Sequence, residues 1–338
     1  MLRLHEYRYL RPARLAEAAE LLHGREDAMA VAGGTDLVPN MKHRLWTPRV
    51  LVGLKGVEEM QGIRLEDAEG APVAEGDPAA RSLSLGAAVT LAETARSPLV
   101  RRLFPSLAAA AGKVAGPQIR NQGTLGGNLC LDTRCTYYNQ SFFWRNALGF
   151  CLKKDGDVCH VTRVGKKCVA ANSADTPPVL TTLGAVVELA SAEGARTVPV
   201  EEFFVADGKW NTVRRPGELV VRVRVPLPPP GLRTAYVKLR QRESVDFPLL
   251  SVALAAEVAE DETLRGMSLV VSALGARPRV VSGLEKTVGH RPAEVAEAVA
   301  QQAYKQCHPL ENIIVDPEWR RAMVSVYVRR AVEEISRG

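Results

Sequence analysis

A cluster of cysteines is the feature that most constrains the fold of this sequence. Four of its six cysteines lie within 34 residues, spaced C-x15-C-x7-C-x8-C. Six of the chain's 18 Phe, Trp and Tyr residues fall between the first two of these cysteines. In a reducing compartment, clustered cysteines more often bind metal or do redox chemistry than form disulfides. We therefore expect packed structure around a metal site formed by Cys135, Cys151, Cys159 and Cys168.

The composition is that of a folded globular protein. The chain has 338 residues, 46% of them hydrophobic and 24% charged, which is enough for two or three domains. No apolar run approaches the ~20 residues of a membrane span, and the N-terminus lacks the apolar core of a signal peptide. We expect a cytoplasmic protein with no membrane association. A net charge of +6 gives no reason to expect nucleic acid as a partner.

Hydrophobic periodicity predicts an α/β region followed by an α+β region. A helix at 15–22, a strand at 28–32, a helix at 38–46 and a strand at 50–54 form a small β-α-β type unit. Further strands are predicted at 63–69, 82–90, 185–191, 219–228, 252–259 and 267–275, and helices at 105–114, 292–305 and 317–336. The sequence PLPPPG at 226–231 is the best linker candidate. The expected divisions are 1–57, 58–228 and 229–338.

Two glycine-bearing turns are candidate anion sites. The first glycine turn is AVAGGTDL (30–37), directly after a strand, and the second is QGTLGGN (122–128). Glycine lets backbone N–H groups approach a ligand closely, and successive N–H groups form a nest for oxygens such as those of a pyrophosphate. Taken singly, each is more typical of an ordinary turn. Neither matches the G-x-G-x-x-G fingerprint of a Rossmann site.

Four motifs in order resemble those of one protein family. They are AGGTDL, GPQIRNQGTLGGN, SADTPPVL and YVKLRQRESVDFPLLSVAL. This series resembles the FAD-binding medium subunit of the xanthine dehydrogenase and carbon monoxide dehydrogenase family of molybdenum hydroxylases, and the likeness weakens after about residue 275. The resemblance implies a two-part FAD-binding domain followed by a small α+β C-terminal domain. It implies that FAD is bound by Ala30, Val31, Ala32, Gly33, Gly34, Thr35, Asp36, Leu37, Val114, Gly123, Thr124, Leu125, Gly126, Gly127, Asn128, Asp175 and Lys238.

Without the resemblance, two of these residues have simpler interpretations. Asp175 precedes TPPVL and would be the N-cap of a helix. Lys238 would be a solvated lysine on a strand.

The cysteine segment (129–170) resembles a rarer feature of the same family. Its sequence TRCTYYNQS and its cysteine spacing are similar to those of the β subunits of 4-hydroxybenzoyl-CoA reductases, in which an extra loop holds a [4Fe–4S] cluster. The residues themselves leave zinc and free buried thiols open, although the C-x-x-C pairs typical of structural zinc are absent. Cys130 and Cys307 are expected to be small buried hydrophobic residues, and His160 a surface or packing residue.

The resemblance implies an electron-transfer subunit of an oxidoreductase. Its partners would be a molybdopterin-containing large subunit, a [2Fe–2S] small subunit and a ferredoxin-like electron donor, and the complex would remove the phenolic hydroxyl of 4-hydroxybenzoyl-CoA reductively, a step of aromatic degradation. No residue of this chain is assigned as a substrate acid or base. Two alternatives remain: the FAD subunit of another molybdenum hydroxylase that oxidises an aromatic or N-heterocyclic substrate, and a metal-stapled binding or assembly protein.

Overall fold

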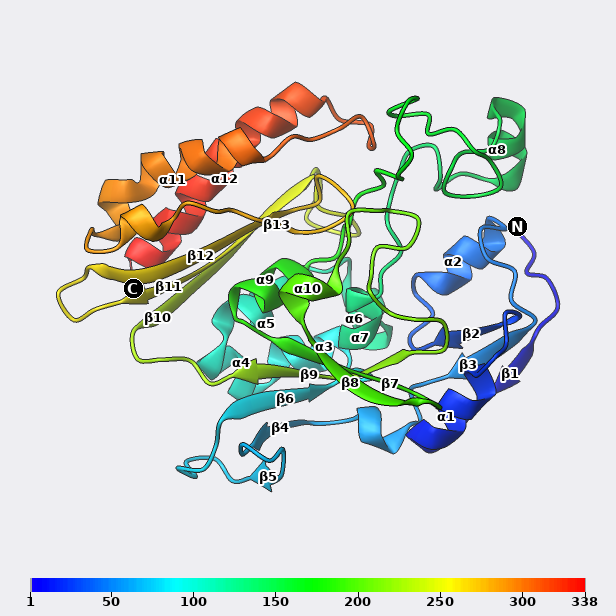
Figure 1. Cartoon of the computed structure of the whole chain (residues 1–338), viewed down its shortest axis with the longest axis horizontal. Coiled ribbons are helices and arrows are strands. Elements are labelled where there is room, and N and C mark those ends of the chain that lie inside the picture. The colour runs from blue at the N-terminus through cyan, green and yellow to red at the C-terminus, as the bar shows by residue number, and fades with distance from the viewer. Residues whose placement is uncertain (1, 338) are drawn as a thin grey trace.

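The protein is built from three β-sheets with helices packed between and over them (Figure 1). The structure is a computed structural model that describes residues 2–337. The strands are β1 (Arg8–Leu10), β2 (Ala28–Val31), β3 (Val50–Gly53), β4 (Ile63–Glu66), β5 (Pro72–Val73), β6 (Ser82–Gly86), β7 (Val186–Ser191), β8 (Gly194–Pro199), β9 (Leu219–Pro226), β10 (Leu232–Leu239), β11 (Leu250–Val258), β12 (Leu264–Ser272) and β13 (Arg279–Val280). The α-helices are α1 (Leu15–Leu22), α2 (Leu37–Lys42), α3 (Leu91–Arg96), α4 (Pro98–Leu103), α5 (Pro105–Gly112), α6 (Pro117–Gln122), α7 (Leu125–Leu129), α8 (Phe142–Leu148), α9 (Thr176–Thr182), α10 (Val200–Phe203), α11 (Pro292–Gln306) and α12 (Pro317–Ser336), and 3₁₀ turns lie at Glu58–Met60 and Glu285–Thr287.

The N-terminal sheet is small and parallel, in the order β1-β3-β2. Its central strand β3 reads VLVG and is buried along its whole length, as a strand covered on both faces must be. The predicted β-α-β type unit is therefore confirmed. The helix predicted at 38–46 is shorter than expected, because it ends at Lys42 and Arg44 adopts a φ of 56° that an α-helix cannot contain.

The second sheet has six strands in the order β5-β4-β6-β9-β7-β8, paired antiparallel throughout. Its central strand β9 buries nearly every residue of LVVRVRVP, including Arg222. The strands predicted at 63–69, 82–90, 185–191 and 219–228 are all present, with ends that differ by at most four residues. Helices α5 and α9 lie between this sheet and the third one (Figure 1), and they contact β10, β11 and β12 of the latter.

The third sheet is antiparallel, in the order β10-β11-β12-β13, and α11 and α12 cover its outer face (Figure 1). Both predicted C-terminal helices are confirmed, with bounds close to those expected. One fully buried cation lies here: Arg320 on α12 donates to the backbone carbonyls of Leu249 (3.1 Å) and Ala273 (2.7 Å). It also donates to the side chain of Asn312, in the loop before α12, which faces the cysteine segment.

The cysteine segment is mostly irregular, and it is fastened to three other parts of the chain. Arg145 on α8 donates to the backbone carbonyls of His43 and Arg44, both at 3.3 Å. The N–H of Gly208 donates to the carbonyl of Cys168 (2.8 Å), and the N–H of Thr136 donates to the carbonyl of Asn312 (2.8 Å). The prediction that this segment is packed structure is therefore confirmed.

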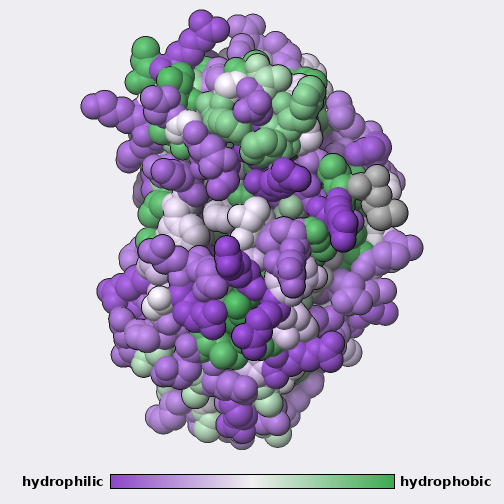
Figure 2. Space-filling view, turned by 90° about the vertical axis from the view of Figure 1, so that its right-hand side faces the viewer, coloured by the Kyte–Doolittle hydropathy of each residue, from purple (hydrophilic) through white to green (hydrophobic). Residues whose placement is uncertain are grey.

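The outer side of the cysteine segment carries a hydrophobic patch. Helix α8 exposes apolar side chains, and Phe143 is 82% exposed. Figure 2 shows hydrophobic residues gathered on the upper part of the face where α8 lies, above a largely hydrophilic region. The exposed apolar side chains of α8 are Phe142, Phe143, Trp144 and Leu148. Within residues 2–337, no helix has the length and apolar character needed to cross a membrane.

Candidate functional site

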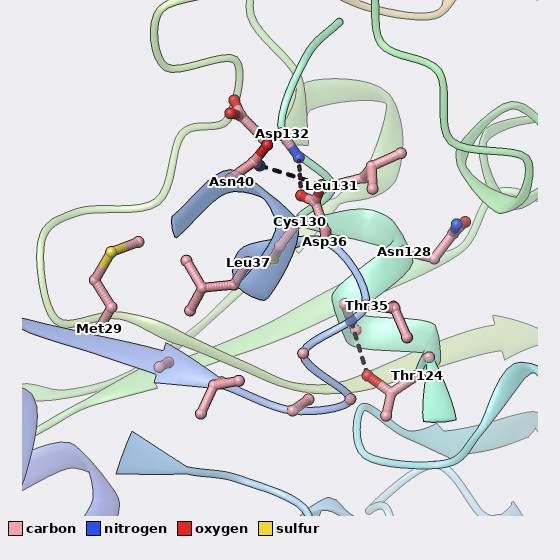
Figure 3. A pocket seen from close by; sticks show the side chains of 18 of the residues that line it. Met29, Thr35, Asp36, Leu37, Asn40, Thr124, Asn128, Cys130, Leu131 and Asp132 are labelled. Atoms are coloured by element: carbon pink, nitrogen blue, oxygen red, sulfur yellow. Dashed lines mark hydrogen bonds between the residues drawn. The ribbon is translucent and has the colours of Figure 1, made fainter. Parts of the chain in front are cut away.

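One large cleft, of about 1240 Å³, is lined by residues of the N-terminal sheet, the second glycine turn and the loop between β10 and β11. Figure 3 shows the part of it around the two glycine turns. The volume of the cleft exceeds the range of about 300–1,000 Å³ that is typical of small-molecule pockets, which suits an extended ligand such as a dinucleotide. Both glycine turns line it, although they are almost 90 residues apart in the sequence.

The two glycine turns touch through their backbones. A Cβ placed on Gly33 would lie 2.0 Å from the carbonyl oxygen of Gln122 and 2.9 Å from the nitrogen of Gly123. No side chain fits in that space, so glycine is required at position 33. Gly34 follows with a φ of +68°, a left-handed conformation that glycine adopts without strain.

The second glycine turn is closed by a cap. The N–H of Gly127 donates to the Thr124 hydroxyl oxygen (3.0 Å), which fixes the start of α7 (Figure 3). A Cβ on Gly126 would lie 2.6 Å from the Cβ of Ala87, so this glycine also serves packing. Together the two turns present a concave surface of backbone, which is a suitable cradle for a pyrophosphate.

Asp36 joins the first glycine turn to the residues that follow the second. Its carboxylate accepts from the Asn40 side chain (3.3 Å) and from the backbone N–H of Asp132 (3.0 Å), as Figure 3 shows. It also accepts from the Arg134 guanidinium. The Arg134 guanidinium also lies 4.6 Å from the centre of the Phe247 ring. Asp36 is thus already satisfied by donors from its own chain, and it braces the cleft wall.

A second carboxylate in the lining of the cleft, that of Asp175, is buried. Asp175 is 2% exposed, and its oxygens accept from the Tyr236 hydroxyl (2.6 Å) and from the Lys238 ammonium (2.8 Å). Burial raises the pKa of Asp175, and the Lys238 charge opposes that rise. Burial beside this carboxylate also raises the pKa of Tyr236, so its hydroxyl stays protonated as a donor.

Of the two simpler interpretations, the N-cap position of Asp175 is confirmed, whereas the solvated Lys238 is wrong. Asp175 stands at the N-cap position of α9 but makes no capping hydrogen bond with its side chain. The Lys238 side chain is 1% exposed, because it and Tyr236 project from the same face of β10 toward Asp175. Lys238 does not line the cleft itself and contacts it through Asp175.

Replacing Asp175 by asparagine is expected to destabilise the fold as well as weaken cofactor binding. The change leaves the buried Lys238 ammonium without its counterion, which costs about 3–5 kcal/mol in comparable buried pairs. Urea unfolding followed by circular dichroism measures this loss. The double variant with Lys238→Met should recover much of the stability, and a single variant as stable as the parent would show that the pair is not coupled.

Most of the residues expected at the site line the large cleft. They are Ala30, Val31, Ala32, Gly33, Gly34, Thr35, Asp36, Leu37, Val114, Gly123, Thr124, Gly126, Gly127, Asn128 and Asp175. Leu125 does not: its side chain is fully buried in the hydrophobic core under α7. The sequence interpretation missed Trp46, Trp210, Arg242 and Phe247 in the lining. Of these, Phe247 stands in the motif VDFPLL and could have been found there.

The four clustered cysteines line a second, small cavity, here called the cysteine cavity. Cys135, Cys151, Cys159 and Cys168 all face it, with Tyr137, Tyr138, Lys153 and His160 among the other lining residues. Burial raises the pKa of Cys135 to about 11 and also raises the pKa of Cys168. Within residues 2–337, none of the six cysteines is paired in a disulfide. Among residues 2–337, no three His, Cys, Asp or Glu side chains are grouped closely enough to hold one metal ion.

The two remaining cysteines lie elsewhere. Cys307 is 2% exposed in the core under α11, as predicted. Cys130 is half-buried and lines the large cleft instead of the cysteine cavity. His160 stacks near Tyr137 with ring centres 5.3 Å apart, and its Nε2 lies 2.9 Å from the carbonyl oxygen of Gly149.

Two family profiles match this chain, one after the other. Residues 5–228 match the "FAD binding domain in molybdopterin dehydrogenase", and residues 235–335 match the "CO dehydrogenase flavoprotein C-terminal domain". The nicotine 6-hydroxylase medium subunit of Paenarthrobacter nicotinovorans is 29% identical, over 98% of each chain. The carbon monoxide dehydrogenase medium chain of Afipia carboxidovorans is 30% identical, over 96% of this chain and 95% of its own.

Solved structures agree with this likeness. A chain of the reconstituted CO dehydrogenase from Oligotropha carboxidovorans superposes with a TM-score of 0.79, at 26% identity and 99% coverage of both chains. The expected mixed α/β fold with an FAD-binding part and a C-terminal α+β part is confirmed by these matches.

Proposed function

Because this chain belongs to the xanthine dehydrogenase and carbon monoxide dehydrogenase family of FAD-binding medium subunits, we propose that it is the electron-transfer subunit of a complex resembling 4-hydroxybenzoyl-CoA reductase. In this proposal the complex removes the phenolic hydroxyl of an aromatic CoA thioester reductively. The chain contributes a flavin site and a [4Fe–4S] site. A molybdopterin-containing large subunit and a [2Fe–2S] small subunit complete the complex.

The observation that most supports this proposal is that four cysteines spread over 34 residues line one cavity. The same cysteine segment also contributes residues to the lining of the large cleft. The donor set fits a cluster. A single zinc ion, with Zn–S bonds of about 2.3 Å, needs its four sulfurs within about 4 Å of one another. A four-iron cluster binds each thiolate to a different iron and accepts wider spacing. A bound cluster would supply one-electron transfer at this position.

The large cleft fits FAD through its own residues. The backbone of the two glycine turns would bind the pyrophosphate, and Asp175, held by Tyr236 and Lys238, would accept hydrogen bonds from the cofactor. Apolar side chains such as Trp46 and Phe247 line the same cleft and limit access of water. FAD supplies electron transfer in pairs or singly. The residues proposed to contact or support it are those of both turns together with Val114, Asp175 and Lys238.

The charge around the cysteine cavity supports an acidic one-electron donor of the ferredoxin class. Seven Lys and Arg residues stand against three Asp residues between positions 130 and 168. Three of the basic side chains, Arg163, Lys166 and Lys167, are exposed between Cys159 and Cys168. Opposite charge steers such partners toward each other. We also propose that the chain divides into units at 1–57, 58–228 and 229–338.

A second function is favoured by the relatives themselves. The similarity to a nicotine 6-hydroxylase medium subunit, over 98% of each chain, supports a complex that oxidises an N-heterocycle. The test is to purify the chain with its partner subunits, measure FAD and iron per chain, and assay both reactions. Reduction of 4-hydroxybenzoyl-CoA with a reduced low-potential donor supports the first function. Flavin without iron on this subunit, with turnover of an N-heterocycle, supports the second.

A further inference from the structure

A buried lysine lies between the cysteine cavity and the large cleft. Lys153 lines the cysteine cavity, is 7% exposed, and follows Cys151 by two residues. Its ammonium lies 2.6 Å from Oδ1 of Asp132, and Asp132 lines the large cleft. The ammonium also donates to the carbonyl of Gly208 (2.8 Å) and to Thr133. An ion pair thus forms part of the partition between the two cavities.

Tyr138 completes this partition. Its hydroxyl donates to Oδ2 of Asp132 (2.7 Å), and its ring centre lies 4.3 Å from the Lys153 ammonium. Tyr138 is 1% exposed and also lines the cysteine cavity. The Asp132 carboxylate therefore has a bonded partner on each oxygen, and its backbone N–H reaches Asp36 in the first glycine turn. Burial and the neighbouring carboxylate raise the pKa of Tyr138, so its hydroxyl remains a donor.

Lys153 and Asp132 differ in how strongly their charges act on a centre bound in the cysteine cavity. Lys153 borders the cysteine cavity, where a buried charge is weakly screened, and Asp132 lies on its far side, toward the cleft. Lys153 and all four cysteines line this one cavity, so the ammonium lies beside the space that the thiols enclose. A fixed cation at this place stabilises whichever state of a bound centre carries more negative charge, which is the reduced state.

We propose that Lys153 is a positioning residue that raises the reduction potential of the iron–sulfur centre held by the four cysteines, and that Asp132 attenuates this effect from the side of the large cleft. The inference rests on the proposed function, since it requires a cluster in the cysteine cavity. The ion pair between the two cavities would then set the reduction potential of the cluster, and with it how readily the cluster accepts an electron.

The experiment compares Lys153→Met, which removes the charge but keeps the length, with Lys153→Arg, which keeps the charge. Both are made in the complete complex, and the cluster potential is measured by a redox titration followed by electron paramagnetic resonance. Lys153→Met should lower the reduced-to-oxidised ratio of the cluster about tenfold at a fixed potential, a shift of 59 mV for one electron. Lys153→Arg should stay close to the parent.

Asp132→Asn should shift the reduction potential of the cluster in the opposite direction. Neutralising this carboxylate leaves the Lys153 cation uncompensated, so the potential should rise. A purely structural role predicts loss of iron in Lys153→Met and Asp132→Asn alike, or shifts in the same direction, and either result overturns the inference. If Lys153→Met binds no iron, the decision rests on the other two variants. A parent-like potential in Lys153→Arg together with a raised potential in Asp132→Asn supports the inference. Any other result for these two variants overturns it.

The failure of this inference is distinguishable from failure of the proposed function. A parent complex that contains no iron on this subunit removes the proposed function, and the inference with it. A parent complex with a full cluster whose potential is the same in Lys153→Met overturns the inference alone.

Discussion

Replacing Gly33 by alanine is expected to weaken FAD binding about 100-fold, so that the protein is purified nearly free of flavin. The added Cβ would lie 2.0 Å from the carbonyl oxygen of Gln122, a contact with backbone that no rotamer change can relieve. The two glycine turns must then move apart, which opens the cradle for the pyrophosphate. Overpacking costs about 1–3 kcal/mol, and about 1.4 kcal/mol corresponds to a tenfold change in affinity.

A glycine in open space provides the matched control. Gly266 on β12 has no heavy atom within 4 Å of an added Cβ and does not have a positive φ. Gly266→Ala should keep full flavin, and circular dichroism should show both variants folded. A folded Gly33→Ala protein with full FAD occupancy would mean that the pyrophosphate does not lie at the junction of the two turns.

Replacing Cys151 by serine is expected to remove the iron–sulfur cluster while leaving most of the FAD in place. Serine oxygen is a harder and poorer ligand for iron than thiolate, so iron content should fall close to zero. The large cleft does not include Cys151, and its glycine turns contact each other without help from the cysteine cavity. Reduction of the flavin by a low-potential protein donor should slow strongly.

Cys130→Ser is the control for this experiment. Cys130 precedes Cys135 by only five residues, yet it lines the large cleft and not the cysteine cavity. This variant should therefore keep its iron. If Cys151→Ser loses FAD and folded structure as well as iron, the cysteine segment is a staple of the fold. If it lacks the cluster but its flavin is reduced at the parent rate, the cluster plays no part in electron entry.

Regular elements with a strong hydrophobic pattern could be predicted from the sequence. The alternation in LVVRVRVP identifies β9, and the amphipathic pattern identifies α11 and α12. Helices α6 and α7 could not be predicted, because their sequences, PQIRNQ and LGGNL, are short and contain proline or glycine. Helix α7 depends on the Thr124 cap and on burial of Leu125, which are effects of its surroundings.

The residues of the candidate site likewise include some that could be predicted from the sequence and some that could not. The glycine turns could be found because glycine marks backbone conformation locally. Lys238 could not be placed correctly, because a lysine on a strand is usually solvated, and only the packing of α9 against the third sheet supplies Asp175 as its partner. The Lys153–Asp132 pair likewise joins residues 21 apart in an irregular segment, where no periodicity indicates which side chains meet.

The contact of Gly33 with Gln122 and Gly123 also has a consequence for the order in which the protein matures. A nascent chain that has emerged only as far as β3 contains every strand of the N-terminal sheet, but it lacks the backbone on which its glycine turn rests. Within the described residues, that sheet has only three strands, of three and four residues, which is the lower end of strand lengths in globular proteins. If both turns hold the flavin, as proposed, the binding site can form only after synthesis has passed the second glycine turn.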